Sequence, residues 1–147
     1  MAPFIVLASS FALLRLAGLA GITALDETSL PLRIAVALMF LLTASAHWGK
    51  RRADLVRMVP AWIPRPQLAV TLTGVLELAG AAGMLIPSIA PYAAVGLALL
   101  LVAMFPANVH AARAKLSIAG RPVTPLAERS AMQLVFLAAV LGAGLIG

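Results

Sequence analysis

Four polar side chains stand out against the long apolar stretches of this sequence and could take part in chemistry: His47, Glu77, Asn108 and His110. Glu77 lies in the middle of "TGVLELAGAAG", and the other three lie near the ends of apolar stretches. A carboxyl group and an imidazole can act as general acid and base, and a carboxamide can hydrogen-bond a carbonyl. Which of these roles the four side chains can have depends on the secondary-structure elements that carry them and on whether water or lipid surrounds those elements.

The composition indicates an integral membrane protein. Of the 147 residues, 63% are hydrophobic and 11% are charged, whereas soluble domains carry about 25% charged residues. Polar groups are therefore too scarce to form the exterior of a soluble fold. Cysteine is absent, which excludes disulfides, cysteine-ligated metals and thiol catalysis within this chain.

Five apolar segments predict five spanning helices in a single domain over residues 1–147. Each is close to the about 20 residues that cross a bilayer as a helix, and a helix satisfies its own backbone polar groups in lipid. We therefore expect an all-α, polytopic transmembrane helical bundle. The connection 49–66, with three prolines and Trp62, is either a partial lid in the headgroup layer or a stiff linker. The predicted spans are residues 3–25, 31–48, 67–86, 91–112 and 126–146.

The basic residues predict how the helices are oriented. Nine of the eleven lie in or beside two connections, 49–66 and 113–125, and the positive-inside rule makes that side cytoplasmic. With five spans, the N-terminus is then cytoplasmic and the C-terminus periplasmic or extracellular. The same pattern, with few aromatic residues, argues against a nucleic-acid partner and leaves the lipid bilayer as the main one.

Glu77 allows two interpretations. Burying a carboxylate at mid-bilayer costs at least about 2.5–3.5 kcal/mol, so such a group normally has a partner. Arg15 is predicted at a similar depth in the first span, and a structural ion pair between Arg15 and Glu77 is the first interpretation. In the second, Glu77 is a catalytic proton donor or acceptor. Small residues around it, such as Gly74 and Ala81, favour close helix packing and would also suit a homodimer.

The other polar groups gather near the predicted cytoplasmic ends of the helices. His47, followed by Trp48, ends one span, while Asn108 and His110 end another and Gln133 lies just inside the last. Each could simply reach interfacial water. Together they could bind the polar head of a quinone-like molecule. Two histidines without fixed spacing are a weak metal signal, so no metal site is predicted.

Four motifs resemble those of the DoxX-like membrane proteins: "SAHW", "MVPAWIP", "TGVLELAGAAGMLIP" and "MFPANVHAA". The resemblance covers about residues 32–112, with a looser match to the last helix, and Trp48 stands where that family usually has Phe. It implies a four-helix core in a bacterial inner membrane, to which the N-terminal helix is an addition. It also implies a pocket containing His47, Glu77, Asn108 and His110. Some relatives are linked to thiosulfate:quinone oxidoreduction or oxidative stress.

Three hypotheses about function follow. In the first, the chain binds a quinone-like or other lipophilic molecule for a membrane redox or stress-protection system. With no intrinsic cofactor, a redox role would need a quinone or a redox-enzyme partner subunit. In the second, it is a cofactor-free isomerase or hydrolase of a lipophilic substrate, with Glu77 and His110 or His47 as acid and base. In the third, it is a non-catalytic assembly or chaperone subunit.

Overall fold

The apolar segments fold as five long antiparallel helices with two small elements at one end. The structure is a computed structural model that describes residues 1–146. In chain order the elements are α1 (Ala2–Leu19), η1 (Thr23–Leu25), α2 (Ser29–Ser45), α3 (Arg52–Met58), α4 (Pro66–Met84), α5 (Ala90–Arg113), β1 (Ser117–Ile118), β2 (Arg121–Pro122) and α6 (Leu126–Leu145). The expected all-α helical bundle is confirmed apart from the short hairpin β1–β2.

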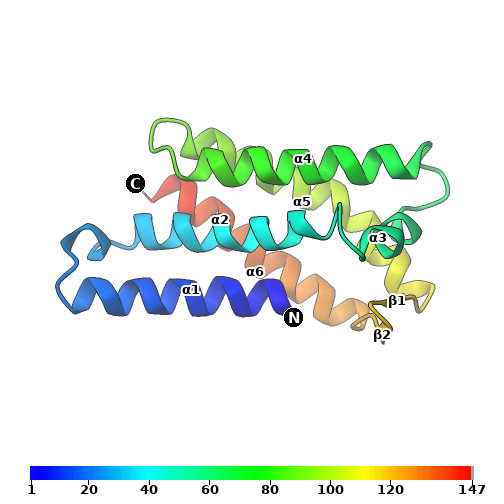
Figure 1. The fold of residues 1–147 in the computed structure, drawn as a ribbon, viewed down its shortest axis with the longest axis horizontal. Coiled ribbons are helices and arrows are strands. Elements are labelled where there is room, and N and C mark those ends of the chain that lie inside the picture. Colours follow the sequence, from blue (N-terminus) through cyan, green and yellow to red (C-terminus); the bar gives the residue numbers. More distant parts are fainter. Residues whose placement is uncertain (147) are drawn as a thin grey trace.

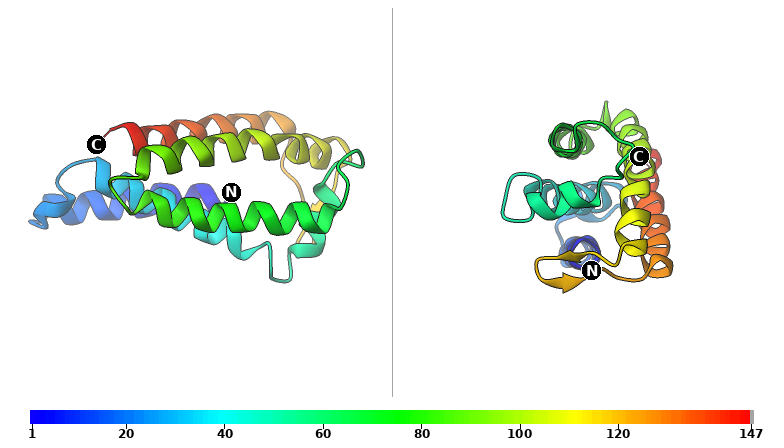
Figure 2. Two further views of the ribbon diagram at one scale, coloured as in Figure 1. Left: turned by 90° about the horizontal axis from the view of Figure 1, so that it is seen from above. Right: turned by 90° about the vertical axis from the view of Figure 1, so that its right-hand side faces the viewer.

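The helices form two layers. Helices α4, α2 and α1 lie side by side in one layer, and α5 and α6 form the other (Figures 1 and 2). Helix α2 is central, with contacts to α1, α4 and α6, whereas α1 packs mainly on α2 at the edge. Because successive long helices run in opposite directions, the ends of α2 and α5 meet the beginnings of α4 and α6 at one end of the bundle (Figure 1).

Small residues let the helices approach closely, as expected for packing in lipid. A Cβ on Gly80 of α4 would lie 2.3 Å from the Leu97 side chain of α5, and one on Gly144 of α6 would lie 2.2 Å from the Ala94 Cβ. A Cβ at either position would therefore force the neighbouring helix or side chain to move. The largest buried side chains of the core between the helices are Val36, Met39, Phe40, Met84, Leu97 and Val140.

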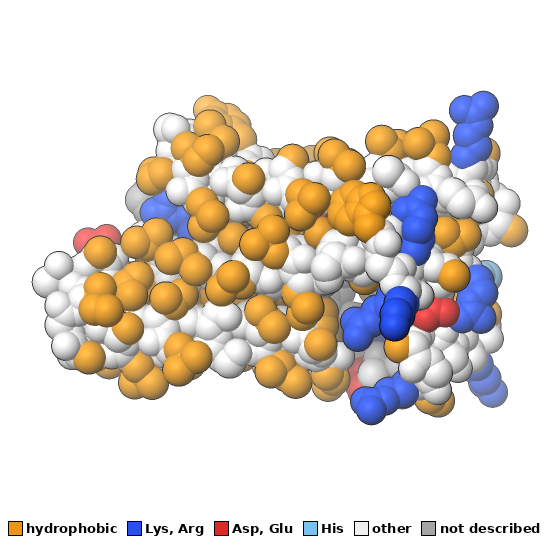
Figure 3. Space-filling model, viewed as in Figure 1, with side chains coloured by type: hydrophobic (Ala, Val, Ile, Leu, Met, Phe, Trp, Pro, Cys, Tyr) orange, Lys and Arg blue, Asp and Glu red, His pale blue; other side chains and the backbone are white. Residues whose placement is uncertain are grey.

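The outer surface of the bundle is apolar along its length and basic at one end. Large apolar side chains such as Leu13, Leu76 and Leu99 are exposed on the long helices, and Lys and Arg gather around α3 and the hairpin (Figure 3). By length and composition, α1, α4, α5 and α6 could each cross a membrane; α2, with 17 residues, is apolar but shorter.

The first helix ends six residues earlier than predicted, which removes the expected ion pair. Because α1 stops at Leu19, Arg15 lies in its last turns and donates hydrogen bonds to the carbonyls of Leu25, at 2.8 Å, and Asp26. A Cβ on Gly18 would lie 2.3 Å from the Leu25 oxygen, so glycine allows this loop to fold onto the helix. The predicted Arg15–Glu77 pair is therefore wrong, since the guanidinium binds the loop between α1 and α2 instead of the carboxyl group.

The two basic connections contain structure that the sequence did not reveal. Helix α3 occupies the first half of 49–66 and ends at Met58, two residues before Pro60. The connection before α6 forms the hairpin, in which Ser117 pairs with Pro122 and Ile118 with Arg121. Helix α5 continues through Pro106 to Arg113. Pro60 and Pro64 therefore lie outside any helix and Pro66 begins α4, whereas Pro106 lies within α5.

Candidate functional site

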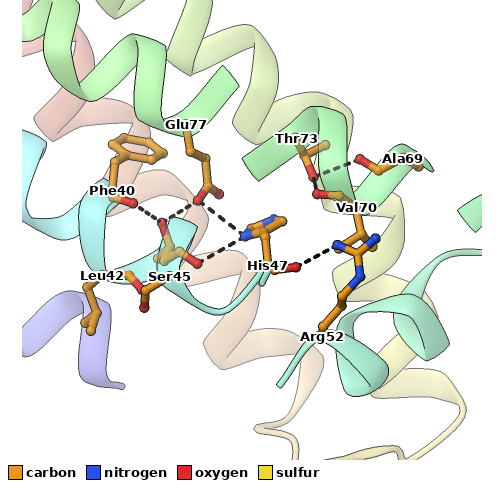
Figure 4. Close-up of polar contacts among 10 residues, drawn as sticks. Phe40, Leu42, Ser45, His47, Arg52, Ala69, Val70, Thr73 and Glu77 are labelled. Atoms are coloured by element: carbon orange, nitrogen blue, oxygen red, sulfur yellow. Dashed lines mark hydrogen bonds and ion pairs between the residues drawn. The ribbon is translucent and has the colours of Figure 1, made fainter. Parts of the chain in front are cut away.

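The end of α2 places His47 beside Glu77. Glu77 is 2% exposed and His47 6% exposed. The Thr43 hydroxyl lies 2.8 Å from Glu77 Oε2 and 3.1 Å from the Phe40 carbonyl, and the Nδ1 of His47 lies 3.1 Å from the Thr43 carbonyl and 3.8 Å from Glu77 Oε2 (Figure 4). The 3.8 Å separation is too long for a hydrogen bond, so Thr43 links the imidazole to the carboxyl group.

Gly74 makes room for this arrangement on α4. A Cβ at Gly74 would lie 2.7 Å from His47 Cβ and 2.8 Å from Trp48 Cη2. Gly74 is eight residues, roughly 12 Å, from the start of α4. The imidazole therefore lies well inside the bundle, level with Glu77. With 6% of its surface exposed, His47 does not extend from the end of α2 into solvent, as one interpretation of the sequence would have it.

Arg52 fixes the turn that carries His47. Its guanidinium donates to the His47 carbonyl at 2.7 Å and, on α4, to the Gln67 carbonyl at 3.0 Å and the Thr71 hydroxyl at 2.9 Å. These charge-assisted hydrogen bonds satisfy a carbonyl at the end of α2 and tie α3 to α4. The positions of the imidazole and of α3 are thus set by the same side chain.

A second polar group comes from α5 and α6. Arg129, in the first turn of α6, donates to Asn108 Oδ1 at 2.5 Å and to the Thr124 carbonyl at 3.3 Å. Both Asn108 and Arg129 are partly buried. A guanidinium that donates to a carboxamide oxygen still has further N–H groups. It can therefore also bind a carbonyl or anionic oxygen of a molecule that lies between α5 and α6.

These groups line one cavity of about 360 Å³, within the range of about 300–1,000 Å³ typical of small-molecule sites. Glu77, His47 and Thr73 lie on the α2–α4 side, Asn108 and Arg129 on the α5–α6 side. Helix α3 and the segment after it, which includes Pro60 and Ile63, close another side. The apolar part of the lining is Ala2, Pro3, Leu42, Ala46, Leu55, Met58, Val59, Pro60, Ile63, Ala69, Val70, Ala103, Met104, Ala107 and Ile118.

A comparison with protein families matches residues 36–143 to one family, described as a domain of unknown function (DUF8561). The chain belongs to this family. The DUF8561 match runs from α2 to α6, so it includes both polar sides of the cavity and leaves α1 outside. No curated protein and no solved structure matches the chain.

Three predicted site residues lie away from the cavity of this DUF8561 protein. His110 is partly buried but does not line it, and Trp48 packs on Gly74 with 47% of its surface exposed. Gln133 is also outside the lining, and its buried Nε2 has no hydrogen-bond partner within residues 1–146. His47, Glu77 and Asn108 are the predicted residues that the fold brings together. Within the same residues no cluster of three potential metal ligands occurs.

Three further residues line the cavity that the sequence analysis did not predict: Thr43, Thr73 and Arg129. Thr43 lies four residues before His47, so helical periodicity could have placed both on one face. Thr73 could have been noticed one turn before Glu77 on α4. In the sequence, Arg129 contributes only to the basic charge that predicts orientation. Its role depends on Asn108, 21 residues away in the sequence, and no local pattern predicts that contact.

Proposed function

We propose that this chain is a DoxX-like inner-membrane protein with five spanning helices and its basic end in the cytoplasm. The apolar surface along the helices and the concentration of Lys and Arg at one end support this orientation (Figure 3). The DoxX-like motifs support the family, since "SAHW", "TGVLELAGAAG" and "MFPANVHAA" supply His47, Glu77 and Asn108, which line one cavity. The N-terminus is then cytoplasmic and the C-terminus periplasmic.

The cavity, in this proposal, binds the polar head of a lipophilic, quinone-like molecule and serves a membrane redox or stress-protection system. One observation carries it: an apolar cavity has the Glu77–Thr43–His47 chain on one side and Asn108–Arg129 on the other. A few convergent polar groups in an apolar pocket fix the orientation of a ligand, and apolar walls accept its hydrocarbon part.

Each polar residue then has a distinct part in binding. Asn108 and Arg129 hold an oxygen of the head group, and Glu77 exchanges a proton with it. Thr43 keeps the carboxyl group oriented through its hydroxyl, and its backbone carbonyl holds the His47 imidazole beside that group. Because the chain has no cysteine and no redox cofactor of its own is proposed, electrons would come from or pass to the ligand or a partner subunit.

The test is mass spectrometry of the lipids that co-purify with the gently extracted protein. A defined lipophilic compound should be present in the wild type and reduced at least about tenfold in Asn108→Ala combined with Glu77→Gln. His110→Ala is the matched control, because His110 lies on α5 with Asn108 but outside the cavity, and it should retain the compound. Ordinary phospholipid alone in every sample would overturn the proposal and favour an assembly subunit.

A cofactor-free enzyme is the second candidate, favoured by the imidazole and carboxyl group 3.8 Å apart at one cavity. In that case Glu77 and His47, rather than His110, act as base and acid on a lipophilic substrate. Conversion of the co-purified compound without an electron donor, abolished by Glu77→Gln, would favour this candidate over binding alone.

A further inference from the structure

The two sides of the cavity differ in hydrogen-bond character. On the α2–α4 side, Thr43 donates to Glu77 Oε2. The other carboxyl oxygen, Oε1, receives no hydrogen bond within residues 1–146. The partner of His47 Nδ1 is a carbonyl, which can only accept, so Nδ1 carries the proton and Nε2 of the neutral ring is an acceptor. When Glu77 is ionised, this side therefore offers only acceptors and calls for a ligand that donates.

The opposite side offers donors. Asn108 Oδ1 is occupied by Arg129, so its Nδ2 amide remains to donate to a ligand. The guanidinium uses Nε and one terminal nitrogen in its hydrogen bonds to Thr124 and Asn108. Its other terminal nitrogen makes no hydrogen bond within residues 1–146, and Arg129 lines the cavity. This side calls for a carbonyl or other electron-rich oxygen.

We infer that the cavity selects a lipophilic compound with a hydroxyl group at one end of its head and a carbonyl oxygen at the other. The hydroxyl donates to Glu77, and the carbonyl accepts from Asn108 and Arg129. The inference rests on the proposed binding function and adds which end of the ligand head donates a hydrogen bond and which end accepts one. A ligand with two carbonyl oxygens, such as a quinone, would face two acceptors unless Glu77 carries its proton, so the ionised form of Glu77 favours the hydroxyl-bearing compound.

The chain offers substitutions that change one side at a time. In Glu77→Leu the acceptor is lost, and the Thr43 hydroxyl keeps its partner because the Phe40 carbonyl lies 3.1 Å away. In Asn108→Asp the oxygen that accepts from Arg129 is kept, while the Nδ2 donor becomes an acceptor. Neither variant leaves a neighbouring side chain without its partner. Circular dichroism and thermal unfolding check that both are folded.

The experiment is calorimetric titration in detergent with three matched probes. The first is the dodecyl ester of para-hydroxybenzoic acid, which has a phenol and a carbonyl. The second is its methyl ether, which lacks the donor, and the third is dodecylphenol, which lacks the carbonyl. The wild type and the His110→Ala control should bind the first probe at least about tenfold more tightly than either of the others.

The variants should each lose one preference. Glu77→Leu should bind the ester and its methyl ether within about twofold of each other. Asn108→Asp, which keeps the free Arg129 nitrogen, should prefer the ester over dodecylphenol severalfold less than the wild type does. Equal binding of all three probes by the wild type would overturn the inferred polarity, while a co-purified ligand would keep the proposed function. If no probe binds and no compound co-purifies, both fail.

Discussion

At the scale of single residues, the site depends on how the buried carboxyl group of Glu77 is satisfied. No lysine or arginine forms an ion pair with it within residues 1–146. Instead a threonine hydroxyl contacts it at 2.8 Å and an imidazole lies 3.8 Å away. This leaves one carboxyl oxygen for a ligand. A guanidinium in direct contact would have occupied the group and made the residue structural.

Gly74→Ala should disturb this arrangement. The new methyl group would lie within 2.8 Å of the His47 ring and of Trp48, so both must move, with an overpacking cost of about 1–3 kcal/mol. We expect a lower unfolding temperature and at least a severalfold loss of the co-purified compound. Gly96→Ala is the control, because nothing lies within 4 Å of its Cβ. Equal behaviour of the two variants would contradict the packing role of Gly74.

Arg15→Ala and Glu77→Ala should act independently. Because Arg15 binds the Leu25 and Asp26 carbonyls and Glu77 contacts Thr43, their changes in unfolding free energy should add within about 0.3–0.5 kcal/mol. Denaturant titration of the two single variants and the double variant measures the sum. A coupling of several kcal/mol would instead restore the ion pair that the sequence suggested.

At the scale of elements, α3 and the hairpin form a clamp beside the cavity. Asp54 Oδ2 accepts from the Ala119 backbone N–H at 2.8 Å, and Arg57 donates to both Asp54 and the Ser117 carbonyl. Helix α3 contributes Leu55 and Met58 to the cavity, and Ile118 reaches it from the hairpin. The two connections therefore close the basic end together, although neither was predicted to contain a helix or a strand.

The clamp should open at acid pH. The Ala119 N–H, and after it the Arg57 guanidinium, lower the pKa of the Asp54 carboxyl below its usual value. A carboxyl group with a lower pKa in the folded state stabilises it fully above its unfolded pKa, about 3.9 for Asp. That contribution is lost as the pH falls through the lowered pKa.

Amide hydrogen exchange at Ala119, corrected for the intrinsic rate, measures the opening of the contact between Asp54 and the hairpin. Protection should be constant from neutral pH to about pH 4 and fall below it, and Asp54→Ala should remove it at every pH. Glu128→Ala is the control, since Glu128 forms no ion pair with the clamp. Protection that persists in Asp54→Ala would show that the hairpin holds itself closed.

At the scale of the whole molecule, antiparallel helices bring both basic connections to the end where the cavity lies (Figures 1 and 3). Arg51, Arg52 and Arg129 serve local contacts or line the cavity as well as adding charge to this end. Orientation in the membrane and the approach to the cavity are thus linked. In the proposed orientation, a ligand head would enter the bundle from its cytoplasmic half.

The proposed orientation predicts which introduced cysteines an impermeant maleimide reaches. Because the chain has no cysteine, single substitutions report cleanly. In intact spheroplasts the exposed Ser88→Cys, between α4 and α5, should be labelled, and the exposed Ala114→Cys, after α5, only after permeabilisation. The buried Ala35→Cys is the unreactive control. The reverse pattern would invert the orientation, and labelling of both would mean that α5 does not span.

The sequence by itself determined the helical class, the positions of the long helices and the concentration of charge at one end. These properties follow from local composition: a run of about 20 apolar residues can satisfy its backbone in lipid only as a helix. It also identified His47, Glu77 and Asn108, because isolated polar groups in such runs are conspicuous. The sequence did not predict α3 or the hairpin, since such short elements are too small to show a hydrophobic periodicity.

Only the tertiary structure decided which polar groups meet. The early end of α1 separated Arg15 from Glu77, and Gly74 let His47 enter the bundle beside the carboxyl group. The pairing of Asn108 with Arg129 required α5 and α6 to lie together at one end. Such contacts depend on helix ends that shift by a few residues and on close approaches set by single glycines. No periodicity along the chain encodes them, because each joins residues from different helices.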